Sequence, residues 1–292
     1  MLDLSFDVVL VPRRAPFPAL FPAAFLAALL GGCAGNGAGL DANGEPLTAG
    51  NGTPPPLTAD FQSIQDNVFT PICVPCHSGP AAPQGLQLDA THSYALLVGV
   101  PSVEVAAVLR VDPGMPDQSY IVMKLEGAAG IVGGQMPLGE APLPQSTIDV
   151  IRQWISAGAP AAAAATAVAS AESHFQVTVL SPADQAVIAA SALRIVVGFN
   201  HELDASLVNS TTLSLERLAP LGAEPPSGEP VSAALALARG NPRAVLVSPA
   251  SPLAPGRYRL SVRGSGGGAL ADQQAQALER DYVSEFTVDG VR

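Results

Sequence analysis

The hydrophobic residues of the chain follow one spacing before residue 160 and another after residue 172. In the earlier segment they recur at intervals of three and four, which places them on one face of a helix. One stripe, in residues 58–69, consists of Phe61, Ile64, Val68 and Phe69, and another, in residues 146–157, consists of Ile148, Ile151, Trp154 and Ile155. Gly158 and Pro160 follow as helix stops. The pattern predicts two helices that can cross and close over a ligand, with Trp154 in their core.

Beyond residue 172 the apolar residues alternate with polar neighbours, which is the period of a β-strand. The alternating positions are Phe175, Val177 and Val179; Leu193, Ile195, Val197 and Phe199; Leu213 and Leu215; Leu235 and Leu237; Tyr258, Leu260 and Val262; and Phe286 and Val288. Turn signals separate them at Ser181-Pro182, Asn241-Pro242 and Pro255-Gly256. The predicted fold is therefore multidomain: a small all-α domain over residues 58–160, an Ala-rich linker over 161–172 and an all-β antiparallel sandwich over 173–292.

The first 32 residues have the composition of an export signal. Arg13 and Arg14 precede an apolar stretch, and Gly31-Gly32 precede Cys33. The run from Leu29 to Cys33 resembles the bacterial lipobox, which implies that Cys33 becomes the lipidated first residue of an exported protein. The expected location is the cell envelope, at the periplasmic face or in the outer membrane.

A membrane-spanning helix is the alternative for this stretch. The apolar run from residue 17 to residue 30 is shorter than the roughly 20 residues that a span needs, and Pro18 and Pro22 interrupt it. We therefore expect a lipid anchor, followed by a flexible linker over residues 34–57, which are rich in Gly, Asn, Pro and Thr.

The sequence Cys73-Val74-Pro75-Cys76-His77 has the spacing of a covalent haem c attachment site. Two thiols three positions apart on one helical turn can add to the two vinyl groups of a haem, and the adjacent imidazole then lies beneath the iron. We expect thioethers at Cys73 and Cys76 and a proximal ligand at His77. Because haem is attached to such proteins outside the cytoplasm, this motif and the export signal support each other.

Two other functions are compatible with a pair of cysteines at this spacing. A thiol–disulfide oxidoreductase also uses Cys-x-x-Cys, but there a long helix follows the motif, whereas here Pro80 and Pro83 follow it closely. A structural zinc site needs further ligands at a defined spacing, and His92 alone does not supply them. The haem interpretation is favoured.

A six-coordinate haem needs a distal ligand, commonly a methionine thioether. Met136 lies in a Gly-rich loop, Gly133-Gly134-Gln135-Met136-Pro137, and is the predicted ligand. Met115, in what reads as a turn, and His92 are the alternatives.

Residues 60–160 resemble the planctomycete-type cytochrome c domain. The matching stretches are residues 69–79 with the Cys-x-x-Cys-His motif, Gly85-Leu86-Gln87-Leu88, residues 94–100, Arg110-Val111-Asp112-Pro113-Gly114, residues 119–125, Gln135-Met136-Pro137 and residues 154–159. The resemblance implies a haem-binding electron carrier. It also favours Met136, because that family usually has a polar residue in a turn at the position of Met115.

Residues 173–290 resemble the bacterial Ig-like domain of surface and S-layer proteins. The matching pieces are Pro182 and Asp184, Val197-Gly198-Phe199-Asn200 with Leu203-Asp204, residues 253–260, and Asp272. The resemblance implies a spacer or adhesive scaffold. His174 and His201 are interpreted as solvated loop residues, and the aspartates as turn caps.

Charge and cysteine content narrow the functional classes. The net charge of -11 argues against a nucleic-acid partner, and three cysteines cannot form a disulfide scaffold. The predicted function is electron transfer to a redox partner protein through one covalent haem c with His/Met ligation, rather than catalysis. A structural or adhesive surface lipoprotein, and a haem enzyme or sensor with an open iron position, remain the alternatives.

Overall fold

The computed structural model describes residues 56–162, 174–190, 193–219 and 228–290. The predicted signal peptide, the lipidation site Cys33, and most of the linkers at 34–57 and 161–172 lie outside the described residues. In the part described, no helix is long and apolar enough to cross a membrane.

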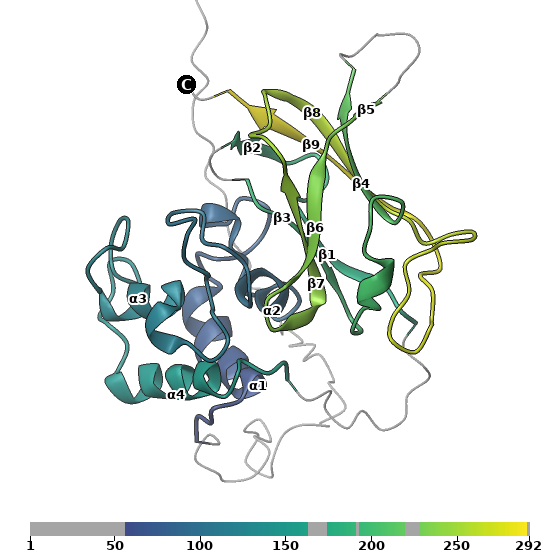
Figure 1. The fold of residues 1–292 in the computed structure, drawn as a ribbon. Coiled ribbons are helices and arrows are strands. Elements are labelled where there is room, and N and C mark those ends of the chain that lie inside the picture. The colour runs from purple at the N-terminus through teal and green to yellow at the C-terminus, as the bar shows by residue number, and fades with distance from the viewer. Residues whose placement is uncertain (1–55, 163–173, 191–192, 220–227, 291–292) are drawn as a thin grey trace, which may run out of the picture. The chain divides into compact units, whose positions relative to one another are not determined.

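Short helices and loops make up residues 56–162 (Figure 1). In chain order the helices are α1 Phe61–Ile64, the π-helical η1 Gln65–Cys73, η2 Pro83–Gly85, α2 Ser93–Leu97, η3 Pro116–Gln118, α3 Tyr120–Glu126 and α4 Gln145–Ser156. Two isolated bridges, Val98–Val111 and Pro101–Leu109, join the loop that follows α2. We refer to this part as the helical region.

Both predicted helical stripes are buried in the helical region. Trp154 of α4 is fully buried, and its ring centroid lies 5.4 Å from that of Phe61 in α1. Its indole nitrogen donates a hydrogen bond to the carbonyl of Pro160. The first helix begins later than the predicted residue 58, because the Asp60 carboxylate caps it by accepting from the Ser63 amide. It also continues past Phe69 to Cys73.

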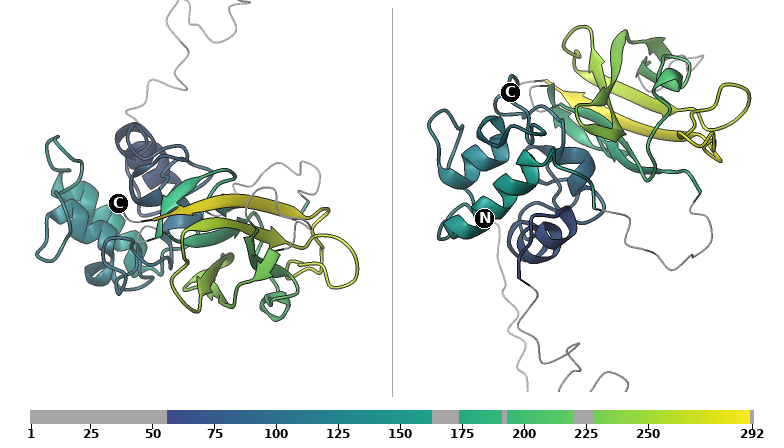
Figure 2. Two further views of the ribbon diagram at one scale, coloured as in Figure 1. Left: turned by 90° about the horizontal axis from the view of Figure 1, so that it is seen from above. Right: turned by 60° about the horizontal axis from the view of Figure 1, so that its bottom comes forward.

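The C-terminal region is a sandwich of two sheets (Figures 1 and 2). One sheet has the order β1-β3-β7-β6, with β1 Val177–Ser181, β3 Ile195–Phe199, β7 Asn241–Pro249 and β6 Ala233–Ala238. The other has the order β2-β9-β8-β4-β5, with β2 Val187–Ala189, β9 Tyr282–Asp289, β8 Gly256–Val262, β4 Leu213–Leu218 and β5 Gly228–Pro230. A short helix, η5 Ala205–Leu207, precedes β4.

The predicted sandwich is present, but two of its expected details are wrong. The pairing is not wholly antiparallel, because β2 runs parallel to β9. Asn241-Pro242 is not the turn but the start of β7, and the turn lies at Arg239-Gly240, since Ala238 pairs with Asn241 and Gly240 has a φ of 68°. A left-handed residue in a two-residue hairpin loop favours glycine.

The described residues from 56 onward form one compact unit, in which the helical region and the sandwich share a small core. Its buried residues are Ala95, Leu96 and Val100 of the helical region and Val179, Val196, Ala238 and Ala244 of the sandwich. Gly198 in β3 allows this approach, because a Cβ atom there would lie only 2.8 Å from the Cβ of Ala95. An ion pair between Arg239 and Asp112 lies at the same contact.

Candidate haem-binding site

The Cys-x-x-Cys-His motif occupies the turn at the C-terminal end of η1. The Val74 amide donates to the Phe69 carbonyl, and the His77 amide donates to the Cys73 carbonyl, each at 2.9 Å. The helical winding therefore continues through the motif, so Cys73, Cys76 and His77 lie on one turn. Gly79, with a φ of 70°, then ends it.

The ring of His77 is held by one backbone carbonyl. Its Nδ1 lies 3.0 Å from the Leu86 oxygen. A carbonyl only accepts hydrogen bonds, so Nδ1 carries the proton, and in the neutral ring the lone pair is on Nε2. Metal-binding histidines are typically oriented in this way by their other nitrogen. The Leu88 amide, which donates to the His77 carbonyl at 2.8 Å, fixes the same loop from the other side.

The loop that supplies this acceptor is tied to the first helix. Gln65 is buried, and its side-chain amide donates to the Leu88 carbonyl at 2.9 Å and accepts from the Ser93 hydroxyl at 2.6 Å. This role of Gln65 could not be predicted, since a polar residue on a helix is usually exposed. The loop that follows the motif is thus tied to both flanking segments by the side chains of Gln65 and Ser93.

The two cysteines lie in different surroundings. Both are free thiols; Cys76 is exposed, whereas Cys73 is half-buried and packs against the core of the helical region. Burial, with a smaller contribution from Cys76, raises the pKa of Cys73 to about 11. Cys73 also lies at the C-terminal end of a helix, where the helix dipole disfavours a thiolate. Thiol–disulfide oxidoreductases need the opposite, a lowered thiol pKa.

Met136 packs against the same core as Cys73. Its amide donates to the Lys124 carbonyl at 2.9 Å, and the neighbouring Gln135 side chain donates to the Leu125 carbonyl at 2.7 Å. The loop carrying Met136 is therefore fixed to α3 by backbone and side-chain hydrogen bonds.

Hydrogen bonds from the partly buried side chains of Tyr120 and Lys124 hold the other end of this loop, at Val132. The Val132 amide donates to the Tyr120 hydroxyl at 3.0 Å, and that hydroxyl donates to Glu104 at 2.8 Å. Lys124 donates to the Val132 carbonyl at 2.7 Å and lies 3.4 Å from Glu104. The contacts among Glu104, Tyr120 and Lys124 could not be predicted from the sequence, because the spacing of these three residues is that of ordinary surface residues.

The described residues fit a haem in the chemistry of their side chains. The motif presents two thiols and an oriented imidazole, and Met136 offers a thioether on the same core. Two exposed apolar side chains flank these positions in sequence: Ile72, 39% exposed, precedes Cys73, and Leu138, 69% exposed, follows Met136-Pro137.

The other candidate iron ligands have different environments. Met115 is 39% exposed, and its backbone forms a turn in which its amide donates to the Asp112 carbonyl. His92 is half-exposed, and its Nδ1 lies 2.7 Å from the Asp89 carboxylate. Within the described ranges, no group of three or more His, Cys, Asp or Glu side chains is arranged to hold a metal ion. The zinc alternative therefore gains nothing from the structure.

His201 lies in a loop, as predicted, but only 25% of its side chain is exposed. Its Nδ1 lies 2.8 Å from the buried Asp272 carboxylate, and its ring stacks on Phe175 at 6.0 Å. Asp272 does cap a turn, as predicted, because it accepts from the amides of Gln274 and Gln276. His174 is exposed and pairs with the equally exposed Glu279.

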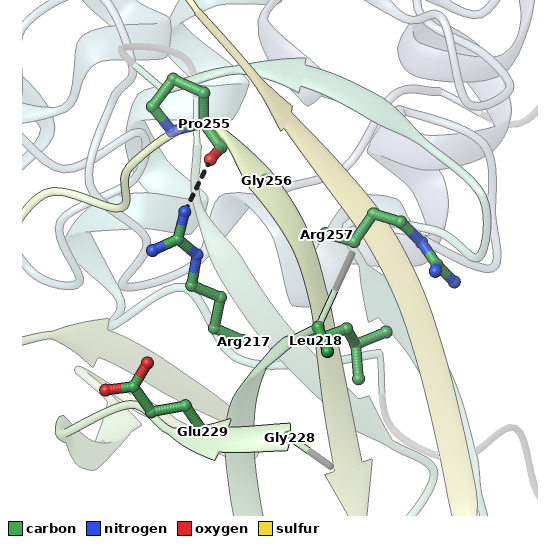
Figure 3. A pocket seen from close by; sticks show the side chains of 8 residues that line it. Arg217, Leu218, Gly228, Glu229, Pro255, Gly256 and Arg257 are labelled. Carbon is green, nitrogen blue, oxygen red and sulfur yellow. Dashed lines mark hydrogen bonds between the residues drawn. The ribbon is translucent and has the colours of Figure 1, made fainter. Parts of the chain in front are cut away.

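A cavity of about 680 Å³ lies on the sandwich, and Figure 3 shows its lining. Arg217 donates to the Pro255 carbonyl at 3.1 Å, and Glu229 lines the same cavity. Arg257, also in the lining, pairs with Glu285. Its lining contains one carboxylate, that of Glu229, and no serine, cysteine or histidine.

Residues 171–288 match the family model of the bacterial Ig-like domain. No curated protein is significantly similar to the chain.

Several solved structures are similar to the chain at low identity. One is PcoC, a methionine-rich copper resistance protein from Escherichia coli, at 24% identity and a TM-score of 0.31, covering 40% of this chain and 99% of that one. Another is CopC from Methylosinus trichosporium OB3b, at 20% and 0.29, covering 40% and 94%. Domains 1–6 of the surface layer protein SbsC are similar at 14% and 0.28, covering 51% and 16%. The family match confirms that the C-terminal part of the chain contains a bacterial Ig-like domain at the predicted place.

Proposed function

We propose that residues 58–160 form a c-type cytochrome domain that transfers electrons, carried on an exported, lipid-anchored chain. Cys73 and Cys76 would hold the haem through thioethers, with His77 as proximal and Met136 as distal iron ligand. The observation that carries the proposal is the hydrogen bond between His77 Nδ1 and the Leu86 carbonyl. It leaves Nε2 available on a turn that also presents both thiols.

When bound, the haem would supply a one-electron ferric/ferrous couple. The protein's own role would be to hold the iron ligands in place and to limit the access of water to the iron. The Leu86 carbonyl orients His77, while Gln65 fixes the loop behind it. The hydrogen bonds from α3 hold the Met136 loop in place. Two protein ligands would leave no position for substrate, so electron transfer is favoured over catalysis.

For the Ig-like domain we propose a structural role at the cell surface or in the envelope. In the described part of this domain, apolar side chains from both sheets form one continuous core, and the cavity beside Arg217 is lined by no serine, cysteine or histidine. The second candidate is a surface lipoprotein whose function is carried by the Ig-like domain. The family match at 171–288 favours it. Lipid attachment at Cys33 would serve either function.

The distal ligand offers a test with a matched control. Met136→Leu should convert the ferrous protein from one that resists carbon monoxide at neutral pH to one that binds it, because a coordination position opens. Met115→Leu, which changes the same residue type in a turn, should leave carbon monoxide binding unchanged. Strong binding by the parent protein would instead support a haem enzyme or sensor with an open position, and an effect confined to Met115→Leu would reverse the ligand assignment.

A further inference from the structure

Two arginines from distant parts of the chain line one small cavity of about 240 Å³. Arg110 comes from the loop between α2 and α3, and Arg194 precedes β3 of the sandwich. The rest of the lining comes from residues 80–82 and 84–85 of the helical region, and from Ser181 and β2 of the sandwich. The lining contains no Asp or Glu.

Arg110 is among the most buried charged residues described, at 5% exposure. Its Nη1 donates to the Leu96 carbonyl and its Nη2 to the Gln84 carbonyl, each at 2.8 Å. A guanidinium has five N–H groups, so these two bonds leave three unused. Burial first, and then the charge of Arg194, lowers the pKa of Arg110 to about 10. The group is thus a desolvated cation with a second cation nearby.

Arg194 is half-buried and is likewise bonded only to carbonyls. Its Nη2 donates to Ser102 at 2.7 Å, its Nη1 to Leu193 at 2.7 Å and its Nε to Pro101 at 3.4 Å. Burial lowers its pKa as well. In the described ranges, neither Arg110 nor Arg194 forms an ion pair with a carboxylate. Four arginines less buried than Arg110 do: Arg152 with Glu126, Arg239 with Asp112, and Arg257 and Arg259 with Glu285.

Buried charges in proteins are normally paired, because the desolvation of an unpaired ion costs several kcal/mol. Carbonyl dipoles offset part of this cost but carry no net charge. An anion would supply the missing opposite charge, and both arginines line the same cavity. Its volume exceeds that of one water molecule, about 30 Å³ in the liquid, several-fold. Two positive charges and several unused N–H donors match a small dianion with many acceptor oxygens.

From this geometry we propose that the cavity between Arg110 and Arg194 binds a small oxyanion of the phosphate class. The anion links the helical region to the sandwich, because each region contributes one arginine. Ser181, whose hydroxyl donates to the Arg194 carbonyl, lies in the same lining and adds a polar side chain. The site does not depend on the proposed haem function. It is also specific in an electrostatic sense, since a chain with a net charge of -11 repels anions elsewhere.

Titration of the purified exported chain with inorganic phosphate by calorimetry, at low salt and neutral pH, tests the proposal. We expect one phosphate per chain and an increase in melting temperature. Arg194→Gln should weaken binding at least roughly tenfold, the effect of losing one charged hydrogen-bond donor. Arg217→Gln is the matched control, because Arg217 is also an arginine of the sandwich bonded to a carbonyl but lies outside this cavity.

Three outcomes would overturn the proposal. They are absence of phosphate binding by the parent chain up to about 10 mM, unchanged binding by folded Arg194→Gln, and equal weakening by Arg217→Gln, which would indicate only the general charge of the protein. Arg194 is the better position to change, because removing the more buried Arg110 could prevent folding. The heat of phosphate binding does not depend on haem content, so this titration tests the proposal separately from the cytochrome proposal.

Discussion

The sandwich and the helical region differ in the side chains that lie at the edges of their cores. In the sandwich, Phe175 stacks on Phe199 and Tyr258 on Phe286, within one continuous core. In the helical region, Cys73 and Met136 are only half-buried at the edge of the core, and Ile72 and Leu138 are exposed beside them. Exposed apolar side chains also occur on the sandwich, at Val187 and Val283, so the difference lies in the half-buried cysteine and methionine at the edge of the helical core.

The comparison distinguishes residues that stabilise the fold by packing from residues that the fold holds in place as candidate ligands. Packing accounts for the buried aromatic residues of the sandwich. It does not account for a histidine oriented by one carbonyl, or for a methionine loop fixed by several hydrogen bonds. We therefore expect haem to matter for the stability of the helical region and not for that of the sandwich.

Removing both attachment thiols should have the largest effect. The double variant Cys73→Ser, Cys76→Ser should lose covalent haem, and its helical region should lose at least about 4 kcal/mol of ligand-linked stability. Hydrogen exchange should then show lost protection in α3 and α4 but retained protection in β3 and β8. Equal protection of α3 and α4 in the parent and the variant would contradict the contrast between the two regions.

Truncating a large core residue in each region should be the next largest effect. Trp154→Ala should cost about 3 to 5 kcal/mol, because a fully buried ring is lost. Phe286→Ala should cost a similar amount in the sandwich. Urea unfolding measures both costs, and the haem absorption spectrum distinguishes them: we expect a changed spectrum only for Trp154→Ala. A changed spectrum in Phe286→Ala under folded conditions would show that the regions are not separable.

Loosening the Met136 loop should have a smaller effect. Tyr120→Phe removes the hydroxyl that joins Val132 to Glu104, at a cost of about 1 kcal/mol. It should also raise carbon monoxide binding by the ferrous protein, because the loop is less firmly held. Tyr94→Phe is the control, since its hydroxyl donates to the Ala159 carbonyl, away from that loop. If both variants bind carbon monoxide alike, Tyr120 has no special role.

Acid titration of the sandwich should give the smallest effect. Burial raises the pKa of Asp272, but hydrogen bonds from His201 and from the Gln276 and Gln274 amides outweigh it, so the folded pKa lies below the usual 3.8. The resulting stability is present above about pH 4 and is lost as the pH falls through the folded pKa. Asp272→Asn should flatten this acid dependence, as measured by urea unfolding from pH 6 to pH 2. An unchanged slope would show that another group is responsible.

Much of the secondary structure could be predicted from hydrophobic period alone. The stripes at Phe61 and Trp154, and the alternation around Val197 and Leu260, lie in the elements observed. Strand β7 was missed because Pro242, at its start, is read as a turn residue. Strand β2 has only three residues and no buried alternation, so nothing in the sequence marked it or its parallel pairing.

The candidate ligands could be predicted from the sequence, but the groups that orient them could not. Spacing alone indicates Cys73, Cys76 and His77, because the motif is local. The Leu86 carbonyl could not be identified, since its position depends on a loop in which Gln84 has a left-handed φ of 56°. Nor could it be predicted that Arg110 and Arg194 line one cavity, because that cavity forms only where the helical region and the sandwich meet.

The central claim is that haem is covalently bound at Cys73 and Cys76. The most direct test is the reduced pyridine haemochrome spectrum of the chain, produced in a periplasm with haem-maturation machinery and then extracted with acid–acetone. We predict a c-type spectrum that survives extraction in the parent and is absent from the Cys73→Ser, Cys76→Ser variant. A folded, exported chain without any haem spectrum would contradict the account.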